Sequence, residues 1–182
     1  VGGTSGMQNR DLTVHGSDGR DTTFQVDGMT LNGIEGDGRV QSYFNEAMFE
    51  EISYQTSAIN AEVSAGGVRA NMIPRDGGNQ FRGTAFFSAA NKGLQSNNSD
   101  EARAQGLAAP DSLNKVWDFN VSEGGPIKRD KLWFFTAYRD WGVYQYIANS
   151  FFKNGDQTID DASIRSGMLR LTTQVGSKNK FA

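Results

Sequence analysis

Hydrophobic and polar residues alternate along the second half of the chain, and this pattern predicts β-strands. In residues 115–122, three apolar side chains fall on one face: Trp117, Phe119 and Val121. The opposite face is mostly polar, and a period of two is typical of a strand that separates an apolar from a polar medium. Residues 168–175 alternate in the same way and place Leu169 and Leu171 on one face.

Two further strands complete the predicted set of four in this half. They span residues 81–90 and 132–141, although the second has aromatic residues on both faces, so that alternation does not assign its orientation. Between the strands we predict a long polar loop at 91–114, a short turn at 124–131 and a second long segment at 142–167. Short turns that alternate with long loops are typical of an outer-membrane β-barrel.

The first half contains shorter elements of mixed type. We predict strands at four places: residues 12–15, 22–27, 52–56 and 68–73. Asn45 is a good helix cap, and the residues after it favour one short helix over 45–50. The second of the four strands ends in a tight turn at Asp27 and Gly28. This half therefore predicts a small α+β unit.

A glycine-rich stretch joins the two halves. Residues 66–83 read GGVRANMIPRDGGNQFRG, a strand bracketed by a Gly-Gly pair and by a Gly-Gly-Asn turn. Glycine adopts the conformations of tight turns at little steric cost. The stretch is therefore the expected boundary between the halves.

Composition supports a mainly β protein and excludes several classes. The 182 residues predict one domain or slightly more, and 12 phenylalanines, five tyrosines and three tryptophans against three prolines favour β structure over disorder. The formal net charge of -3 gives no reason to expect a nucleic-acid partner. No stretch approaches the roughly 20 apolar residues of a membrane helix, whereas a membrane β-barrel is compatible with the mean hydropathy of -0.55.

Residues that could carry chemistry lack a supporting motif. Four aspartates lie among glycines, where turn formation explains them better than calcium binding: Asp18, Asp21, Asp27 and Asp37. His15 is the only histidine, and no G-x-S-x-G elbow accompanies it. The chain has no cysteine, which excludes a thiolate metal site. We expect neither an enzyme nor a metal or cofactor site.

Glycine-centred motifs follow one another in a fixed order along nearly the whole chain. The order runs through VHGSDGRDTTFQVDGMTLNG, FEEISYQTSAINAEVSAGGVRANMIPRDGGNQFRG and WDFNVSEGGPIKRDKLWFFTAYRDW. The plug and turn motif within it comprises Asp27, Gly28, Gly66, Gly67, Arg69, Arg75, Gly77, Gly78, Asn79, Gly83, Gly124, Gly125 and Pro126. This order resembles the plug domain of TonB-dependent outer-membrane receptors, followed by the first barrel strands of the Oar-like branch of that family.

The resemblance implies a mainly β fold with a small α+β plug domain at residues 1–80 and the first four strands of a truncated transmembrane antiparallel β-barrel at 81–182. Four strands cannot close even a barrel of about eight strands, so we expect a fragment of a longer protein. The implied function is energised uptake, or export, of an unknown ligand through a plug-gated pore in the outer membrane. The implied partners are a TonB-type energising complex of the inner membrane and outer-membrane lipid.

The resemblance also implies roles for particular residues. Arg69 and Arg75 are expected to hold the plug by pairing with inward carboxylates such as Asp118 or Glu123. The residues expected to face lipid or to form the interfacial girdle are Trp117, Phe119, Val121, Trp133, Phe135, Leu169 and Leu171. The loops expected to face the ligand are residues 31–39, 91–114 and 142–166.

A second class of protein is also compatible with the residues. The aromatic side chains suit a soluble β-rich module that stacks on carbohydrate or acts in adhesion. Recovery of the full-length protein in the outer membrane, rather than in the soluble fraction, distinguishes the two classes.

Overall fold

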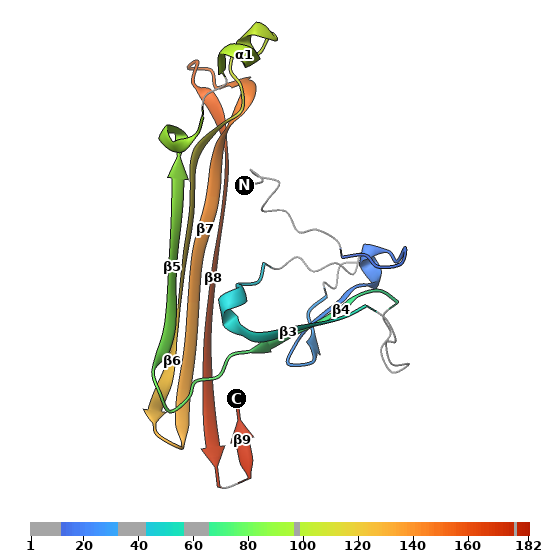
Figure 1. Cartoon of the computed structure of the whole chain (residues 1–182), viewed down its shortest axis with the longest axis vertical. Coiled ribbons are helices and arrows are strands. Elements are labelled where there is room, and N and C mark those ends of the chain that lie inside the picture. The colour runs from blue at the N-terminus through green and yellow to red at the C-terminus, as the bar shows by residue number, and fades with distance from the viewer. Residues whose placement is uncertain (1–11, 33–42, 57–65, 97–98, 177) are drawn as a thin grey trace. The chain divides into compact units, whose positions relative to one another are not determined.

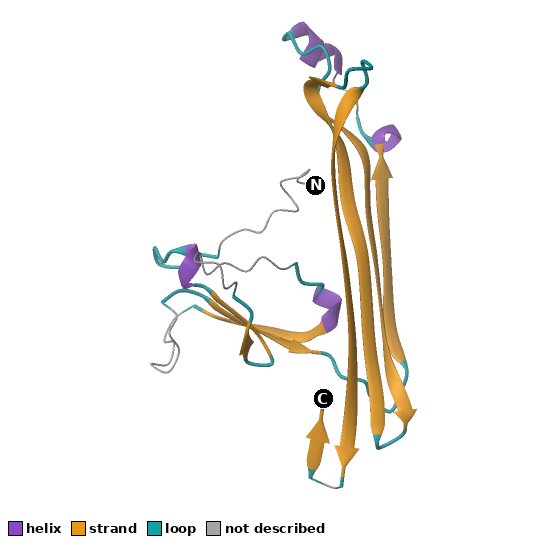
Figure 2. Ribbon diagram, turned by 180° about the vertical axis from the view of Figure 1, so that it is seen from behind, coloured by secondary structure: helices purple, strands orange, loops and turns teal. Residues whose placement is uncertain are grey.

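The computed structural model of the chain describes residues 12–32, 43–56, 66–96, 99–176 and 178–182. In this described part strands dominate and the helices are short, as the colours of Figure 2 show. No helix within it is long and apolar enough to cross a membrane. Its strands form one sheet of four strands and one of five, and neither of these sheets is closed. The expectation of a mainly β fold is therefore confirmed.

The first sheet is built from the N-terminal half of the chain (Figure 1). Its strands are β1 (Thr23–Val26), β2 (Met29–Thr30), β3 (Phe49–Gln55) and β4 (Arg69–Pro74), in the spatial order β2-β1-β4-β3. β1 is antiparallel to β2 and parallel to β4, whereas β3 and β4 are antiparallel. Asp27 and Gly28, with φ angles of 49° and 78°, form the predicted tight turn between β1 and β2.

Short 3-10 helices precede two of these strands. η2 (Gly19–Asp21) is capped by Asp18 and leads to β1. η3 (Glu46–Met48) is capped by Asn45, whose side chain accepts a hydrogen bond from the Ala47 amide at 3.1 Å. The short helix predicted after Asn45 is therefore confirmed as a single turn.

Residues 12–15 do not form the predicted strand. A closed turn takes their place, because the Ser17 amide donates to the Val14 carbonyl at 2.9 Å and the Val14 amide donates to the Ser17 hydroxyl at 3.1 Å. His15 and Gly16 have φ angles of 51° and 80° at this turn. A serine that bonds its own local backbone in this way competes with strand pairing.

The second sheet is a meander in which each strand pairs with the next along the chain. Its strands are β5 (Arg82–Asn91), β6 (Ser112–Lys128), β7 (Leu132–Phe151), β8 (Gln157–Val175) and β9 (Asn179–Phe181). The 3-10 helix η4 (Lys92–Leu94) and the helix α1 (Ser99–Ala104) lie between β5 and β6. β9 pairs antiparallel with β8 and adds a strand to the four that were predicted.

Two connections are shorter than predicted because the strands are longer. Residues 142–151 continue β7 and residues 157–167 belong to β8, which reduces the second long segment to a turn at 152–156. β6 likewise runs through most of the predicted turn at 124–131. The sequence VYQYI at 143–147 explains the longer β7, because aromatic and β-branched residues favour strands even beside polar neighbours.

The described chain divides into two compact units. The first, here called the junction unit, contains the described residues between 12 and 83 together with Ser122–Ala137 and Met168–Ala182. The second, here called the hairpin unit, contains Thr84–Val121 and Tyr138–Gly167. The strands β6, β7 and β8 contribute residues to both units.

The main hydrophobic core lies in the junction unit and joins the first sheet to β7. Its buried side chains are Met48, Phe49, Met72, Phe135 and Ala137. Phe135 is only 4% exposed, so the prediction that it faces lipid is wrong. The reason is that the first sheet supplies an apolar partner to this face of β7, which otherwise reads from the sequence as an exposed aromatic surface.

We expect Met72→Ala to lower the free energy of unfolding by about 2–5 kcal/mol, because truncation of a buried side chain leaves a cavity. Met72 is 3% exposed, whereas its neighbour Ile73 is 38% exposed, so Ile73→Ala is the matched control and should cost less than about 1 kcal/mol. Urea titration of the full-length protein in detergent, followed by tryptophan fluorescence, measures both values. Equal losses would contradict the assigned core.

Candidate functional site

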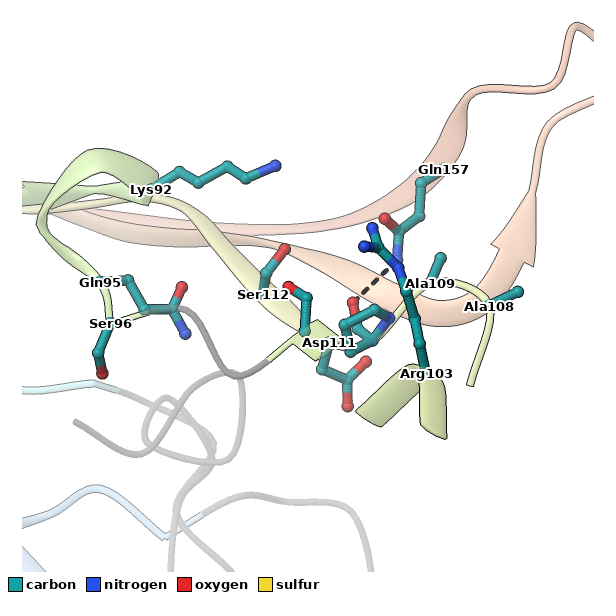
Figure 3. Close-up of a pocket in the computed structure, with 11 residues that line it drawn as sticks. Lys92, Gln95, Ser96, Arg103, Ala108, Ala109, Asp111, Ser112 and Gln157 are labelled. Carbon is teal, nitrogen blue, oxygen red and sulfur yellow. Dashed lines mark hydrogen bonds between the residues drawn. The ribbon is translucent and has the colours of Figure 1, made fainter. Parts of the chain in front are cut away.

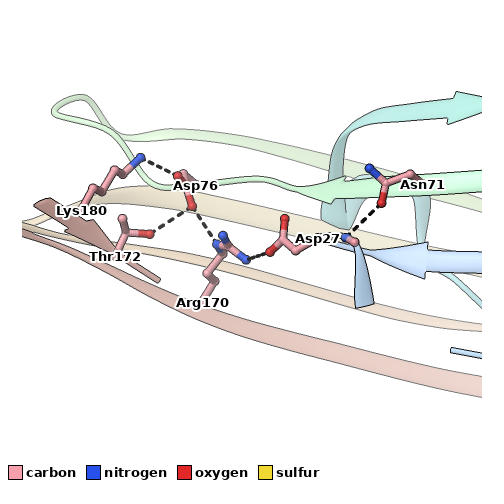
Figure 4. Close-up of polar contacts among 7 residues, drawn as sticks. Asp27, Asn71, Asp76, Arg170, Thr172 and Lys180 are labelled. Atoms are coloured by element: carbon pink, nitrogen blue, oxygen red, sulfur yellow. Dashed lines mark hydrogen bonds and ion pairs between the residues drawn. The ribbon is translucent and has the colours of Figure 1, made fainter. Parts of the chain in front are cut away.

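A charged cluster in the junction unit connects the segment after β4 to β8 and β9 (Figure 4). Asp76 lies at its centre. Its Oδ1 accepts hydrogen bonds from Arg170 Nε at 2.7 Å and from Thr172 Oγ1 at 3.0 Å. Its Oδ2 accepts one from Lys180 Nζ at 2.6 Å. Arg170 and Thr172 are two positions apart on β8, so their side chains share one face of that strand.

Arg170 has a second partner, which extends the cluster to the first sheet. Its Nη1 donates to Asp27 Oδ2 at 2.7 Å. Asp27 occupies the β1–β2 turn, where the amide of Gly28 also donates to Asn71 Oδ1 of β4 at 3.1 Å. One guanidinium group on β8 therefore holds both a turn of the first sheet and the segment that leaves that sheet.

Partial burial and multiple hydrogen bonds distinguish these contacts from ordinary surface ion pairs. The side chains of Arg170 and Asp76 are 22% and 28% exposed, whereas fully exposed pairs contribute about 0–1 kcal/mol. Partial burial raises the pKa of Asp76, but hydrogen bonds from Lys180, Arg170 and Thr172 outweigh it and hold that pKa below its ordinary value of 3.8. Asp76 is therefore ionised at neutral pH.

The segment between β4 and β5 is also fixed by close backbone packing. A Cβ atom at Gly77 would overlap the carbonyl oxygen of Phe134 on β7, so only glycine allows this approach. Asn79 donates to Asp130 Oδ1 at 2.6 Å and accepts from Trp133 Nε1 at 2.8 Å. These contacts attach the segment to the β6–β7 turn and to the start of β7.

The other residues of the predicted plug and turn motif also lie in the junction unit. Those in connections are Gly66, Gly67 and Gly78, and those in β5 and β6 are Gly83, Gly124, Gly125 and Pro126. At Gly83 a Cβ atom would come within 2.6 Å of the Ser122 carbonyl oxygen, which explains a glycine inside a strand.

The two arginines of the motif do not form the predicted ion pairs with Asp118 or Glu123. Arg69 Nε donates instead to Gln25 Oε1 at 2.9 Å, across the first sheet. Arg75 Nε donates to a backbone carbonyl of β3 at 2.9 Å. Both side chains therefore donate to neutral oxygen atoms of the first sheet, which corrects the expected pairing with carboxylates.

Asp118 has a cation of its own on the neighbouring strand. Its carboxylate binds Arg139 of β7 in a bidentate pair, with distances of 2.9 and 2.7 Å. The observed cluster also reverses the predicted placement of the charges, in which the cations belonged to the first half of the chain and the carboxylates to the second sheet. The carboxylates of Asp27 and Asp76 precede the second sheet in the chain, and the cations lie on β8 and β9.

The residues predicted to face lipid differ in their exposure. Phe119, Leu169 and Leu171 are 40%, 68% and 52% exposed, whereas Trp117 and Val121 are half-buried. Trp133 bonds to Asn79 and Phe135 lies in the core, as described above. Leu169 and Leu171 share one face of β8, and contact of the exposed members with lipid stays a prediction.

Four residues of the charged cluster are absent from the predicted site: Arg170, Thr172, Lys180 and Asp76. The sequence does contain a signal for the first two, because alternation in β8 places them opposite Leu169 and Leu171. Their partner Asp76 lies 94 positions before Arg170, and no local pattern predicts a pairing over that distance.

A cavity of about 230 Å³ in the hairpin unit is a second candidate site (Figure 3). Lys92 of η4, Arg103 of α1, Asp111 before β6 and Gln157 of β8 are among the residues that line it. The lining is drawn from four parts of the chain and is rich in polar side chains. Such a cavity can hold a small polar ligand.

The lining of the cavity can be compared with the three loops that are predicted to face a ligand. Most of its lining comes from the loop at 91–114. The segment at 142–166 is largely strand, which corrects that expectation, although Gln157 within it contributes to the lining. Of the loop at 31–39, residues 33–39 lie outside the described residues.

The depressed pKa of Asp76 predicts an acid-sensitive contribution to stability. Because the folded-state pKa lies below the unfolded value of 3.8, this contribution is fully present above that value and is lost as the pH falls through the folded pKa. We expect Asp76→Asn to lower the free energy of unfolding at neutral pH by about 1–3 kcal/mol and to flatten the pH dependence below about pH 4.

Urea titrations of the full-length protein at several pH values measure this effect. Asp100→Asn is the matched control, because the Asp100 side chain is 99% exposed and its ion pair is long, at 3.5 Å. A pH dependence that is the same in the Asp76→Asn variant and in the unchanged protein would contradict the assigned role.

Comparisons with known proteins agree with the sheet architecture. The outer membrane beta barrel domain family matches residues 73–163, which is half of the chain. The TonB-dependent transporter Oar of Myxococcus xanthus is 28% identical over 134 residues, which cover 71% of this chain and 12% of that transporter. No solved structure matches. The family and the relative point to the outer membrane, and the chain belongs to the outer membrane beta barrel domain family.

Proposed function

We propose that this chain is the plug and the first wall strands of a TonB-dependent outer-membrane transporter of the Oar-like branch. In this proposal the plug occupies about residues 1–80, and β5 to β9 begin the barrel wall. The whole protein moves an unidentified ligand inward or outward through the barrel. A TonB-type complex of the inner membrane supplies the energy by displacing the plug.

The observation that carries the proposal is the attachment of the first sheet to β7 and β8 within the junction unit. Met72 and Phe49 pack against Phe135, while Asp27 and Asp76 bind Arg170. A gate must be held in place at rest and released under load. A small apolar core supplemented by partly exposed ion pairs suits this requirement. Such an attachment takes less free energy to break than a large, fully buried apolar interface.

The faces of β8 support a wall strand between lipid and a polar lumen. Leu169 and Leu171 are exposed on one face, whereas Arg170 and Thr172 join the charged cluster on the other. Strands of a transmembrane barrel alternate in this way. β6, β7 and β8 contain 17, 20 and 19 residues, more than the roughly 9–11 that a tilted strand needs to cross a bilayer.

The relative from Myxococcus xanthus supports the assignment to TonB-dependent transporters. That relative is a TonB-dependent transporter, and the match extends over 71% of this chain. Membership in an outer-membrane barrel family also favours a wall strand over a soluble carbohydrate-binding module as the explanation of the exposed aromatic residues. The ligand, the energising partner and the direction of transport belong to the whole protein.

Deletion of residues 1–80 from the full-length protein tests the proposal. Without its plug, the barrel should admit vancomycin, which an intact outer membrane excludes, and the minimum inhibitory concentration should fall severalfold. Outer-membrane level and heat-modifiable migration of the deleted protein must match those of the unchanged protein. If a correctly inserted barrel without these residues gives no added sensitivity, the plug assignment is wrong.

A milder change should loosen the same gate. Arg170→Gln removes the cation shared by Asp27 and Asp76, so we expect a smaller but measurable rise in vancomycin sensitivity. Arg165→Gln is the matched control, because Arg165 lies on the same strand and pairs with Asp140 at 2.8 Å in the hairpin unit. Equal sensitivity of the two variants would argue against a gating role for Arg170.

A further inference from the structure

We infer that the cavity of the hairpin unit binds a small carboxylate-bearing ligand, or the carboxylate end of a longer chain, through Arg103 and Lys92. The inference names a ligand class for the proposed transporter and to that extent rests on the proposed function. Binding is nevertheless a separate property, which can be measured without transport.

The walls of the cavity are fixed by hydrogen bonds before any ligand arrives. Gln95 Oε1 accepts from the Leu113 amide at 2.8 Å, which ties the chain after η4 to β6. Gln157 Nε2 donates to the Pro110 carbonyl at 3.1 Å, which ties the chain before β6 to β8 (Figure 3). A site whose walls are already ordered loses less conformational entropy when a ligand binds.

The charges around the cavity favour an anion. Lys92 and Arg103 line it together with one carboxylate, that of Asp111, so the lining residues alone sum to a net charge of +1. The Asp100 carboxylate, 3.5 Å from Arg103, lies outside the lining and is 99% exposed to solvent. The Asp111 carboxylate accepts a hydrogen bond from the Ala148 amide at 2.6 Å, so a backbone donor already stabilises its charge. The chain as a whole has a net charge of -3, so this positive lining is local.

Arg103 is the better placed of the two cations to bind a carboxylate. Its contact with Asp100 is long, at 3.5 Å, and the two side chains are 61% and 99% exposed, so this pair is weak. The planar guanidinium group matches the geometry of a carboxylate in a bidentate pair. Lys92, whose Nζ lies 5.7 Å from the Tyr146 ring centroid, supplies a second positive charge at the cavity.

The balance of charge selects a monoanion over a phosphate monoester. A phosphate carries about -1.5 to -2 charges at neutral pH, which would exceed the net charge of the lining and would meet the carboxylate of Asp111. A single carboxylate matches the lining charge. Specificity of this kind comes from the repulsion of the wrong ligand as well as from attraction of the right one.

The size of the cavity limits how much of a ligand it can hold. Its volume of about 230 Å³ is below the roughly 300–1,000 Å³ of pockets that enclose drug-sized molecules. Ser96, Ser112 and Gln157 add hydroxyl and amide groups to the lining, which suit the hydroxyl groups of a sugar acid or the last peptide bond of a peptide. The cavity therefore fits one sugar residue or one peptide terminus.

Isothermal titration of the full-length protein in detergent tests the inference with two pairs of probes. D-glucuronate is compared with D-glucose, and triglycine with triglycine amide. We expect the carboxylate member of at least one pair to bind at least tenfold more tightly than its neutral partner. The pair that shows this difference identifies the source of the carboxylate as a sugar acid or a peptide.

Two variants assign the binding to the cavity. Arg103→Gln and Lys92→Gln should each weaken carboxylate binding about tenfold. Lys153→Gln is the matched control, because Lys153 is an exposed cation in the β7–β8 turn and does not line the cavity. It should leave the affinity unchanged. Heat-modifiable migration verifies that each variant is folded.

Several results would overturn the inference. These are equal affinity for the charged and neutral probes, absence of binding for all four, tighter binding of glucose 6-phosphate than of glucuronate, and unchanged affinity in both cavity variants. If carboxylate binding persists while deletion of residues 1–80 opens no pore, this inference stands and the proposed function fails. If the pore opens but no carboxylate binds, the proposed function stands and this inference fails.

Discussion

The contact on which the junction unit depends is the double ion pair of Arg170. This guanidinium group binds Asp27 in a turn of the first sheet and Asp76 in the segment that leaves that sheet, each at 2.7 Å. Arg170 lies on β8, whose pairing and register are set by the second sheet. The position of the first sheet's turn is therefore fixed by a residue that comes 143 positions later in the chain.

Apolar and polar contacts make different contributions to the attachment of the first sheet to β7 and β8. The core around Met72 and Phe135 excludes water and supplies non-directional free energy. The charged cluster and the close approach at Gly77 supply direction, because hydrogen bonds and close backbone contacts depend on the orientation of the groups that make them. Apolar packing alone would permit small shifts of one sheet over the other. The polar contacts exclude such shifts and leave part of the attachment accessible to water, and hence to pH and salt.

The sequence predicts the structural features that depend on residues close by in the chain. It does not predict those that depend on residues far away in the chain. Alternation identifies the strand around Trp117 and Phe119, and Asn45 correctly marks a helical turn, because both are local effects. The burial of Phe135 could not be predicted, since it follows from an apolar partner in another sheet. For the same reason, the partners of Arg69 and Arg75 were misassigned. At the charged cluster, alternation along β8 predicts which face of the strand carries Arg170. No local pattern predicts the two carboxylates that Arg170 binds.

The short segment between β4 and β5 also limits how far the first sheet can travel. It comprises residues 75–81, since β4 ends at Pro74 and β5 begins at Arg82. A fully extended chain spans at most about 3.3–3.6 Å per residue, so these seven residues reach about 25 Å. The segment is thus a covalent tether of fixed length. Displacement beyond that reach requires strand residues of β4 or β5 to unravel, which would convert a rigid-body movement into partial unfolding.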